Sequence, residues 1–189
     1  MSANNDLMLD VSQAAELKLA FRRNGWNNAE IKTLSEGDIL ANVLKVIKGQ
    51  AEIKIIEHLI NCDSAPFVPN NWSVEEHKKG GLFKFDPAKI SLYLSKEQKK
   101  RNISGRNLYE ELADKPVMNA NVLDYLLAHP ELIPEEWKGK YIFFWGTIYY
   151  DSAHILFVRC LGWNGSEWYW GYRWINNYAG SDSPAALTS

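Results

Sequence analysis

The stretch GSEWYWGYRWINNY, which begins at residue 165, is the part of the chain whose residue types and spacing most clearly suggest chemistry. It spaces four aromatic residues two positions apart: Trp168, Trp170, Tyr172 and Trp174. In a β-strand the side chains alternate between two faces, so these four rings project from the same face. That face can pack into a core with Phe144 or Phe157 as cross-strand partners, or stay partly exposed and bind a sugar, a base or a protein. We expect a mixture, with the middle rings buried and the end rings exposed.

A partly exposed face of this kind favours a non-catalytic binding protein. Its contact surface would be the exposed part of the strand from Trp168 to Trp174, flanked by Arg173 and by the Asn164-Gly165 turn. The partner would be a protein or a small-molecule ligand, and we expect no cofactor and no bound metal.

Cysteine and histidine side chains offer an alternative, a small enzyme with an unfamiliar site. Cys62 or Cys160 could attack a substrate with His129 or His154 as the base. The spacing matches no zinc signature, and Cys160 lies in the apolar run FVRCL, which is typical of a buried small side chain. Paired carboxylates such as Glu75 and Glu76 are neighbours in sequence, so on a strand or helix they diverge.

The N-terminal segment LAFRRNGWNNAEIKTLSEG offers a second alternative, a nucleic-acid-associated regulator. Its helix, glycine turn and helix resemble a helix-turn-helix, with Arg22, Arg23 and Lys32 as phosphate contacts and the basic run at 96–101 as a further one. Glu30 and Glu36 lie beside Lys32, so the basic face is sparse, and plain helical packing explains the segment better than DNA binding does.

Length, charge and apolar pattern limit the classes of protein to which the chain can belong. The 189 residues suffice for a self-sufficient core, and the net charge of −2 does not favour a surface built wholly to attract nucleic acid. The N-terminus lacks the pattern of a cleaved signal, and no apolar run approaches a membrane span, so we expect a soluble cytoplasmic protein. Export without a cleaved signal stays open, as does a bridge between the two cysteines.

Helix caps predict a helical unit over residues 1–50. Asp10 with Gln13 and Asn27 with Glu30 form capping boxes, Gly25 ends the first helix, and Asp38 opens a third that ends at Gly49. Such a unit is marginal alone, so we expect it to dock on the rest of the chain.

Residues 51–189 predict a mixed region of strands with two inserted helices, near 104–113 and 119–128. Strands are expected at WSVEEH, GLFKF and KISLYL, with a hairpin between the first two at Gly80-Gly81, and a charged, solvated run at SKEQKKR. Three aromatic runs, YIFFWGTIYY, HILFVRCLGW and SEWYWGYRWI, predict an antiparallel meander closed by Asn164-Gly165. The tail AGSDSPAALTS is expected to be loose.

Several long phrases, among them NANVLDYLLAHPELIPEEWKGK, FFWGTIYYDS and WYWGYRW, resemble those of a widespread group of uncharacterised bacterial proteins. The resemblance runs from about Leu17 to Leu187 and carries no activity, ligand or catalytic residue with it. It implies that the helices and the meander occur together. The sequence as a whole therefore predicts an α+β fold in which an N-terminal three-helix unit packs on an antiparallel, aromatic-rich β region with two inserted helices.

Overall fold

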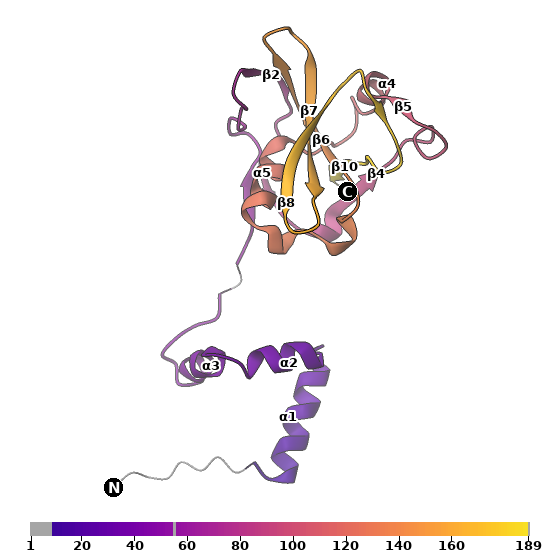
Figure 1. The fold of residues 1–189 in the computed structure, drawn as a ribbon. Helices are drawn as coiled ribbons and strands as arrows, with labels where there is room; N and C mark the ends of the chain where they lie inside the picture. The colour runs from indigo at the N-terminus through magenta and orange to yellow at the C-terminus, as the bar shows by residue number, and fades with distance from the viewer. Residues whose placement is uncertain (1–8, 55, 189) are drawn as a thin grey trace. The chain divides into compact units, whose positions relative to one another are not determined.

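The computed structural model of the chain describes residues 9–54 and 56–188, and it has the predicted α+β class (Figure 1). The chain divides into two compact units, of which the first ends at Ile56 and the second begins at Glu57.

The described part of the first unit contains three helices, α1 (Val11–Arg23), α2 (Asn28–Leu34) and α3 (Ile39–Ile47). The capping boxes at Asp10 and Asn27 are both formed, so the predicted starts of α1 and α2 are confirmed. Gly25 has a positive φ of 80°, which lets the chain leave α1. Asp38 precedes α3 as predicted, although its side chain makes no capping bond.

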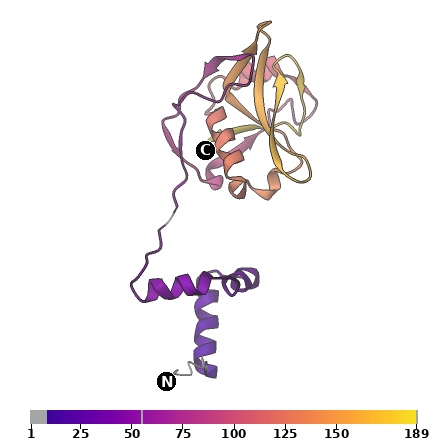
Figure 2. The ribbon, with the colours of Figure 1, turned by 60° about the vertical axis from the view of Figure 1, so that its left-hand side comes forward.

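A six-stranded sheet forms the centre of the second unit (Figure 2). Five strands follow the order β4, β10, β6, β7, β8, and β2 pairs with the distal half of β6. Their bounds are β2 (Trp72–His77), β4 (Ile90–Tyr93), β6 (Ile142–Asp151), β7 (Leu156–Trp163), β8 (Trp168–Trp174) and β10 (Ala185–Thr188). The predicted antiparallel meander is β6, β7 and β8. One pairing departs from the prediction, because β10 runs parallel to β6.

Smaller elements complete this unit. Two short antiparallel pairs join β1 (Leu59–Asn61) to β3 (Leu82–Lys84) and β5 (Ile103–Ser104) to β9 (Tyr178–Ala179). The two inserted helices lie where the sequence predicted them, as α4 (Gly105–Glu111) and α5 (Ala120–Ala128). Single 3-10 turns occupy Pro87–Lys89, Pro130–Leu132 and Glu135–Trp137.

The sheet carries a core on each face, because successive residues of β6 alternate between them. Ile142 and Phe144 pack with Leu123 and Leu126 of α5. Phe143 and Trp145 pack with Leu108 of α4 and its neighbours. Both faces of β6 are therefore covered, which explains why its sequence is a nearly continuous apolar run.

The pairing of two predicted strands was wrong. Gly80 and Gly81 do not close a hairpin, because β2 pairs with β6 and β3 pairs with β1. Gly81 has a positive φ of 69°. Glycine tolerates such a φ at any sharp change of direction, so the dipeptide does not specify which strands meet.

Two segments that were expected to be solvated or loose are partly core. In SKEQKKR the side chains of Ser95 and Gln98 are buried, and the Gln98 amide donates to the carbonyl oxygens of Gly180 and Ser183, each at 2.7 Å. In the tail, β10 lies between β4 and β6 with Ala186 fully buried. Both predictions failed because a tertiary partner, not local composition, decides burial at these positions.

Candidate binding surface

The rings of β8 are unequally exposed. Trp170, Tyr172 and Trp174 are 36%, 55% and 47% exposed, whereas Trp168 is half-buried against the core on the α5 face. The expected pattern of buried middle and exposed ends is therefore wrong. Exposure is instead set by α5, which lies over the Trp168 end of this sheet face and leaves the other end uncovered.

A second layer of aromatic side chains supports the exposed rings. Trp72 of β2 stacks on buried Phe157 of β7 with ring centres 4.6 Å apart. The Tyr172 ring meets both rings edge-on, at 5.1 Å from Trp72 and 5.5 Å from Phe157. Trp174 also packs edge-on against Phe157, at 6.2 Å, which confirms the predicted cross-strand pairing. Edge-to-face pairs fix ring orientation, so the exposed rings are held in place before any ligand arrives.

Phe67 extends the exposed rings beyond β8. It is 53% exposed and lies edge-on to Trp170 with ring centres 6.2 Å apart. The Tyr149 hydroxyl donates to the Phe67 carbonyl oxygen at 3.1 Å and so anchors this loop to β6. Burial raises the pKa of Tyr149, which keeps the hydroxyl protonated and able to donate. We call the exposed side chains Phe67, Trp170, Tyr172 and Trp174 the aromatic surface.

A buried ion pair lies beneath the aromatic surface. The Arg159 guanidinium, 1% exposed, donates to both carboxylate oxygens of Asp124 at 2.7 and 3.1 Å. It also lies against the rings of Phe67 and Trp170, at 5.1 and 4.7 Å from their centres. Arg159 Nε has no hydrogen-bond partner among the described residues. This pair was not predicted from the sequence, although an arginine inside the apolar run LFVRCL is a sign that a charge must be paired in the interior.

Polar groups border the aromatic surface on the Phe67 side. A cavity of about 340 Å³ adjoins Phe67, and its lining includes the polar side chains of Asn61, Ser64, Asn121 and Asp124. The Asn121 amide donates to the carbonyl oxygens of Asn61 and Ser64, each at 2.9 Å. Exposed rings beside a few oriented polar groups are the usual make-up of a ligand site.

The two predicted flanks lie elsewhere. Arg173 projects from the opposite sheet face, where its guanidinium donates to Ser183 Oγ at 3.0 Å and lies 4.6 Å from the Phe143 ring centre. The Asn164-Gly165 turn closes the hairpin beyond Trp168, with a positive φ of 105° at Gly165. Neither feature borders the exposed end of β8.

The cysteines are poor nucleophiles in their observed surroundings. Both are free and buried, and burial raises the pKa of each thiol from 9.0 to about 11. His77 reaches the Cys62 carbonyl oxygen at 3.1 Å rather than its thiol. His129 packs on Tyr125 and His154 on Tyr150. Among the described residues no group of three or more His, Cys, Asp and Glu side chains is placed to hold a metal ion.

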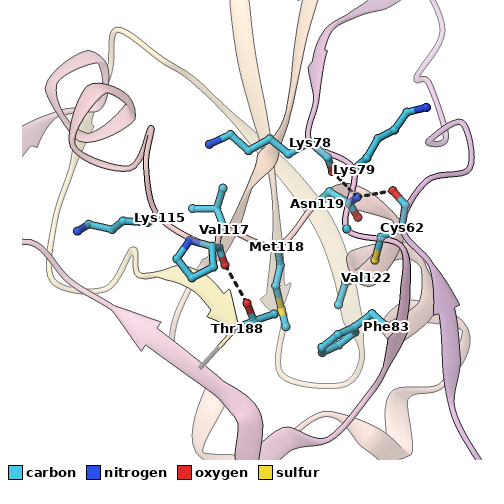
Figure 3. A pocket seen from close by; sticks show the side chains of 12 residues that line it. Cys62, Lys78, Lys79, Phe83, Lys115, Val117, Met118, Asn119, Val122 and Thr188 are labelled. Carbon is cyan, nitrogen blue, oxygen red and sulfur yellow. Dashed lines mark hydrogen bonds between the residues drawn. The ribbon is translucent and has the colours of Figure 1, made fainter.

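A second cavity, of about 360 Å³, has an apolar floor that includes Phe83, Val117, Met118 and Val122 (Figure 3). Three lysines lie at its rim: Lys78, Lys79 and Lys115. In Figure 3 their side chains extend away from the floor, and the Lys78 ammonium donates to the Ala113 carbonyl oxygen at 2.5 Å. The lysines therefore do not converge on one point of the cavity.

The basic residues of the nucleic-acid alternative are divided between the units: Arg22, Arg23 and Lys32 lie on the first, and the basic run at 96–101 lies on the second. Arg22 and Arg23 form the exposed last turn of α1, and Lys32 lies on α2 at 3.9 Å from Glu36. Glu30 is occupied in the capping box of α2. The alternative stays a prediction.

No protein-family model matches the chain, and neither a curated protein nor a solved structure matches it. Within residues 9–54 and 56–188, no helix has the length and apolar character needed to cross a bilayer.

Proposed function

We propose that this chain is a non-catalytic binding protein that holds a neutral oligosaccharide against its aromatic surface. The observation that carries the proposal is the exposure of three neighbouring β8 rings on a rigid aromatic support. Exposing such rings to water has a cost that a folded core would avoid, and contiguous exposed apolar surface is typical of interaction sites.

The surrounding charges favour a neutral ligand. Binding of a nucleic acid depends on lysines and arginines that neutralise phosphates. The arginine beneath the aromatic surface is instead neutralised by Asp124, and Arg173 is turned to the other face. A sugar ring presents a flat face of C–H groups to an aromatic ring and hydroxyls at its edge, and it needs no cation.

The polar lining beside Phe67 supports the same ligand class. Asn61 Oδ1 and the Asp124 carboxylate offer acceptors, and the side-chain N–H groups of Asn61 offer donors, within one cavity. Hydroxyl groups at the edge of a sugar can exchange hydrogen bonds with both kinds of group. Stacking would supply affinity, and these polar contacts would select among sugars.

Affinity electrophoresis in gels containing a soluble β-glucan, a xylan or a mannan tests the proposal. We expect at least one neutral polysaccharide to retard the chain. Trp170→Ala with Trp174→Ala should weaken retention by about tenfold or more, taking for each sugar–ring contact the lower end of the about 1 to 3 kcal/mol that a stacked nucleobase contributes. Tyr178→Ala is the matched control, since Tyr178 is 69% exposed but lies on β9, outside the aromatic surface.

Retention by none of these polysaccharides would refute the proposal. So would retention that the tryptophan variants leave unchanged. Binding of single-stranded DNA in preference to all neutral polysaccharides would instead favour the nucleic-acid alternative.

A further inference from the structure

The outer edge of β8 is a row of backbone groups to which no described residue bonds. β8 ends the strand order of the large sheet, and within residues 9–54 and 56–188 it pairs with β7 alone. Ile175 N donates to Leu156 O at 2.9 Å and Asn164 N to Glu167 O at 3.2 Å. Since bonded positions alternate along an antiparallel strand, the odd-numbered residues of β8 bond toward β7, and the N–H and C=O groups of Trp168, Trp170 and Tyr172 point away from it. Within the described part of the chain, no hydrogen bond reaches these groups.

The edge of β2 shows how this chain protects an edge strand elsewhere. The pairing of β2 with β6 shifts register between Val74 and Glu76, and two carboxylates, Glu75 and Glu76, lie at this point. Bulges and charges of this kind discourage pairing with another strand. β8 has neither device along its outward row: its register with β7 is unbroken from Trp163↔Trp168 to Phe157↔Trp174, it contains no proline, and its one charged residue, Arg173, bonds toward β7.

We propose that the edge of β8 pairs antiparallel with β8 of a second copy of this chain, so that two sheets join into one. The pairing is two-fold symmetric about Gly171, which places Trp170 of each copy opposite Tyr172 of the other. Both N–H···O bonds of each such pair then form between the groups that now lack partners.

The sequence of β8 is self-complementary in this register. Directly opposed residues share a sheet face, so Trp168 of one copy meets Trp174 of the other, and all opposed pairs on this face are aromatic. On the other face Tyr169 lies opposite Arg173, whose guanidinium already contacts Ser183 and Phe143 of its own copy, so no like charges are opposed. Gly171 faces itself at the axis, where strands approach to about 4.5 Å between Cα atoms and a side chain would crowd.

The pairing would place two aromatic surfaces side by side on one face of a continuous sheet. The inference concerns the edge of the strand rather than the rings on its face. It therefore does not rest on the proposed function, and each can fail without the other.

Light scattering after size-exclusion chromatography of the full chain tests the pairing, with Tyr172→Pro as the decisive variant. Proline removes the outward N–H at residue 172 without removing a bond to β7, a position where edge strands tolerate it. Tyr172→Ala is the matched control, because it loses the same ring but keeps the N–H. We expect the wild-type chain to have twice the monomer mass of 21.6 kDa. The dimer dissociation constant should be at least about tenfold higher for Tyr172→Pro than for Tyr172→Ala.

A wild-type chain that stays monomeric at its highest soluble concentration would overturn the inference, as would a Tyr172→Pro dimer as stable as the Tyr172→Ala dimer. Hydrogen exchange of the wild-type chain needs no variant and covers the case in which Tyr172→Pro does not fold. The amides of Trp170 and Tyr172 should exchange more slowly at high than at low protein concentration. Exchange that is independent of concentration would contradict the pairing.

Discussion

At the scale of single residues, the Arg159–Asp124 pair links the interior to the aromatic surface. Arg159 is almost fully buried, while the Asp124 side chain is 31% exposed. A buried charge needs its partner, because losing one member leaves the other uncompensated in a medium of low polarity. The pair also lies against two rings of the surface, so its loss should disturb the surface as well as the fold.

Asp124→Asn should therefore lower the free energy of unfolding by about 3 kcal/mol. This is near the lower end of the cost of removing one partner from a buried ion pair, because Asp124 is partly exposed. Urea unfolding measures this loss. The double variant Asp124→Leu with Arg159→Met should lose less than Asp124→Asn alone, since it removes both charges. A double variant less stable than the single one would contradict this account of the pair.

The two cysteines should make stability fall at high pH. Because burial raises the pKa of each thiol from 9.0 to about 11, the folded state holds these protons more tightly than the unfolded state does. This contribution is complete below about pH 9 and is lost as pH rises through about 11. The pKa values of Tyr93 and Tyr109, raised to about 12 by hydrogen bonds to Glu111 and Glu76, act in the same direction at still higher pH.

The midpoint of urea unfolding should change little between pH 7 and 9 and should decrease clearly between pH 9 and 10.5. Cys62→Ser with Cys160→Ala should reduce the decrease between pH 9 and 10.5. An equal decrease in that double variant would show that other groups are responsible.

At the scale of elements, the sequence predicted what is locally encoded and missed what depends on distant partners. The starts of α1, α2 and α5 follow from cap residues that bond within three positions, and the meander follows from its aromatic and β-branched runs. β10 could not be found in this way, because it is short and its first two residues are alanines, which have low strand propensity. Its place is decided by burial between β4 and β6.

The candidate site could be predicted only in part, because it too depends on distant partners as well as on local pattern. Strand alternation correctly grouped the rings of β8 on one face. Which of them would be exposed depended on the position of α5, and Phe67 joined the surface through a bond from Tyr149, 82 positions away. Neither fact is visible in a local pattern.

The central position of β10 gives a test at this scale. Ala186 is fully buried, and its site offers a carboxylate no partner. Ala186→Asp should therefore lower the free energy of unfolding by more than about 3 kcal/mol. The control is Ala153→Asp, because Ala153 lies at an exposed turn. It should change the free energy of unfolding by about 0.5 kcal/mol or less.

Thermal unfolding followed by circular dichroism measures both alanine variants. If the two variants melted alike, the tail would not be part of the core.

At the scale of the whole molecule, the second unit covers one end of a sheet face with α5 and leaves the other end as an exposed array of rings. Burial at the covered end provides the stability that fixes the strands. The supporting layer of Trp72 and Phe157 then keeps the exposed rings oriented without covering them. Display of rings by a rigid sheet is the central claim of this account.

The most direct test of that claim is a titration of the isotope-labelled full chain with an oligosaccharide of whichever neutral polysaccharide retards it, followed through its eight tryptophan indole N–H signals. We predict that the signals of Trp170 and Trp174 shift most and that Trp72 beneath them follows. The signals of buried Trp137 and Trp145 should stay unchanged. Shifts confined to tryptophans outside β8 and β2, or no shift at saturating ligand, would contradict the claim.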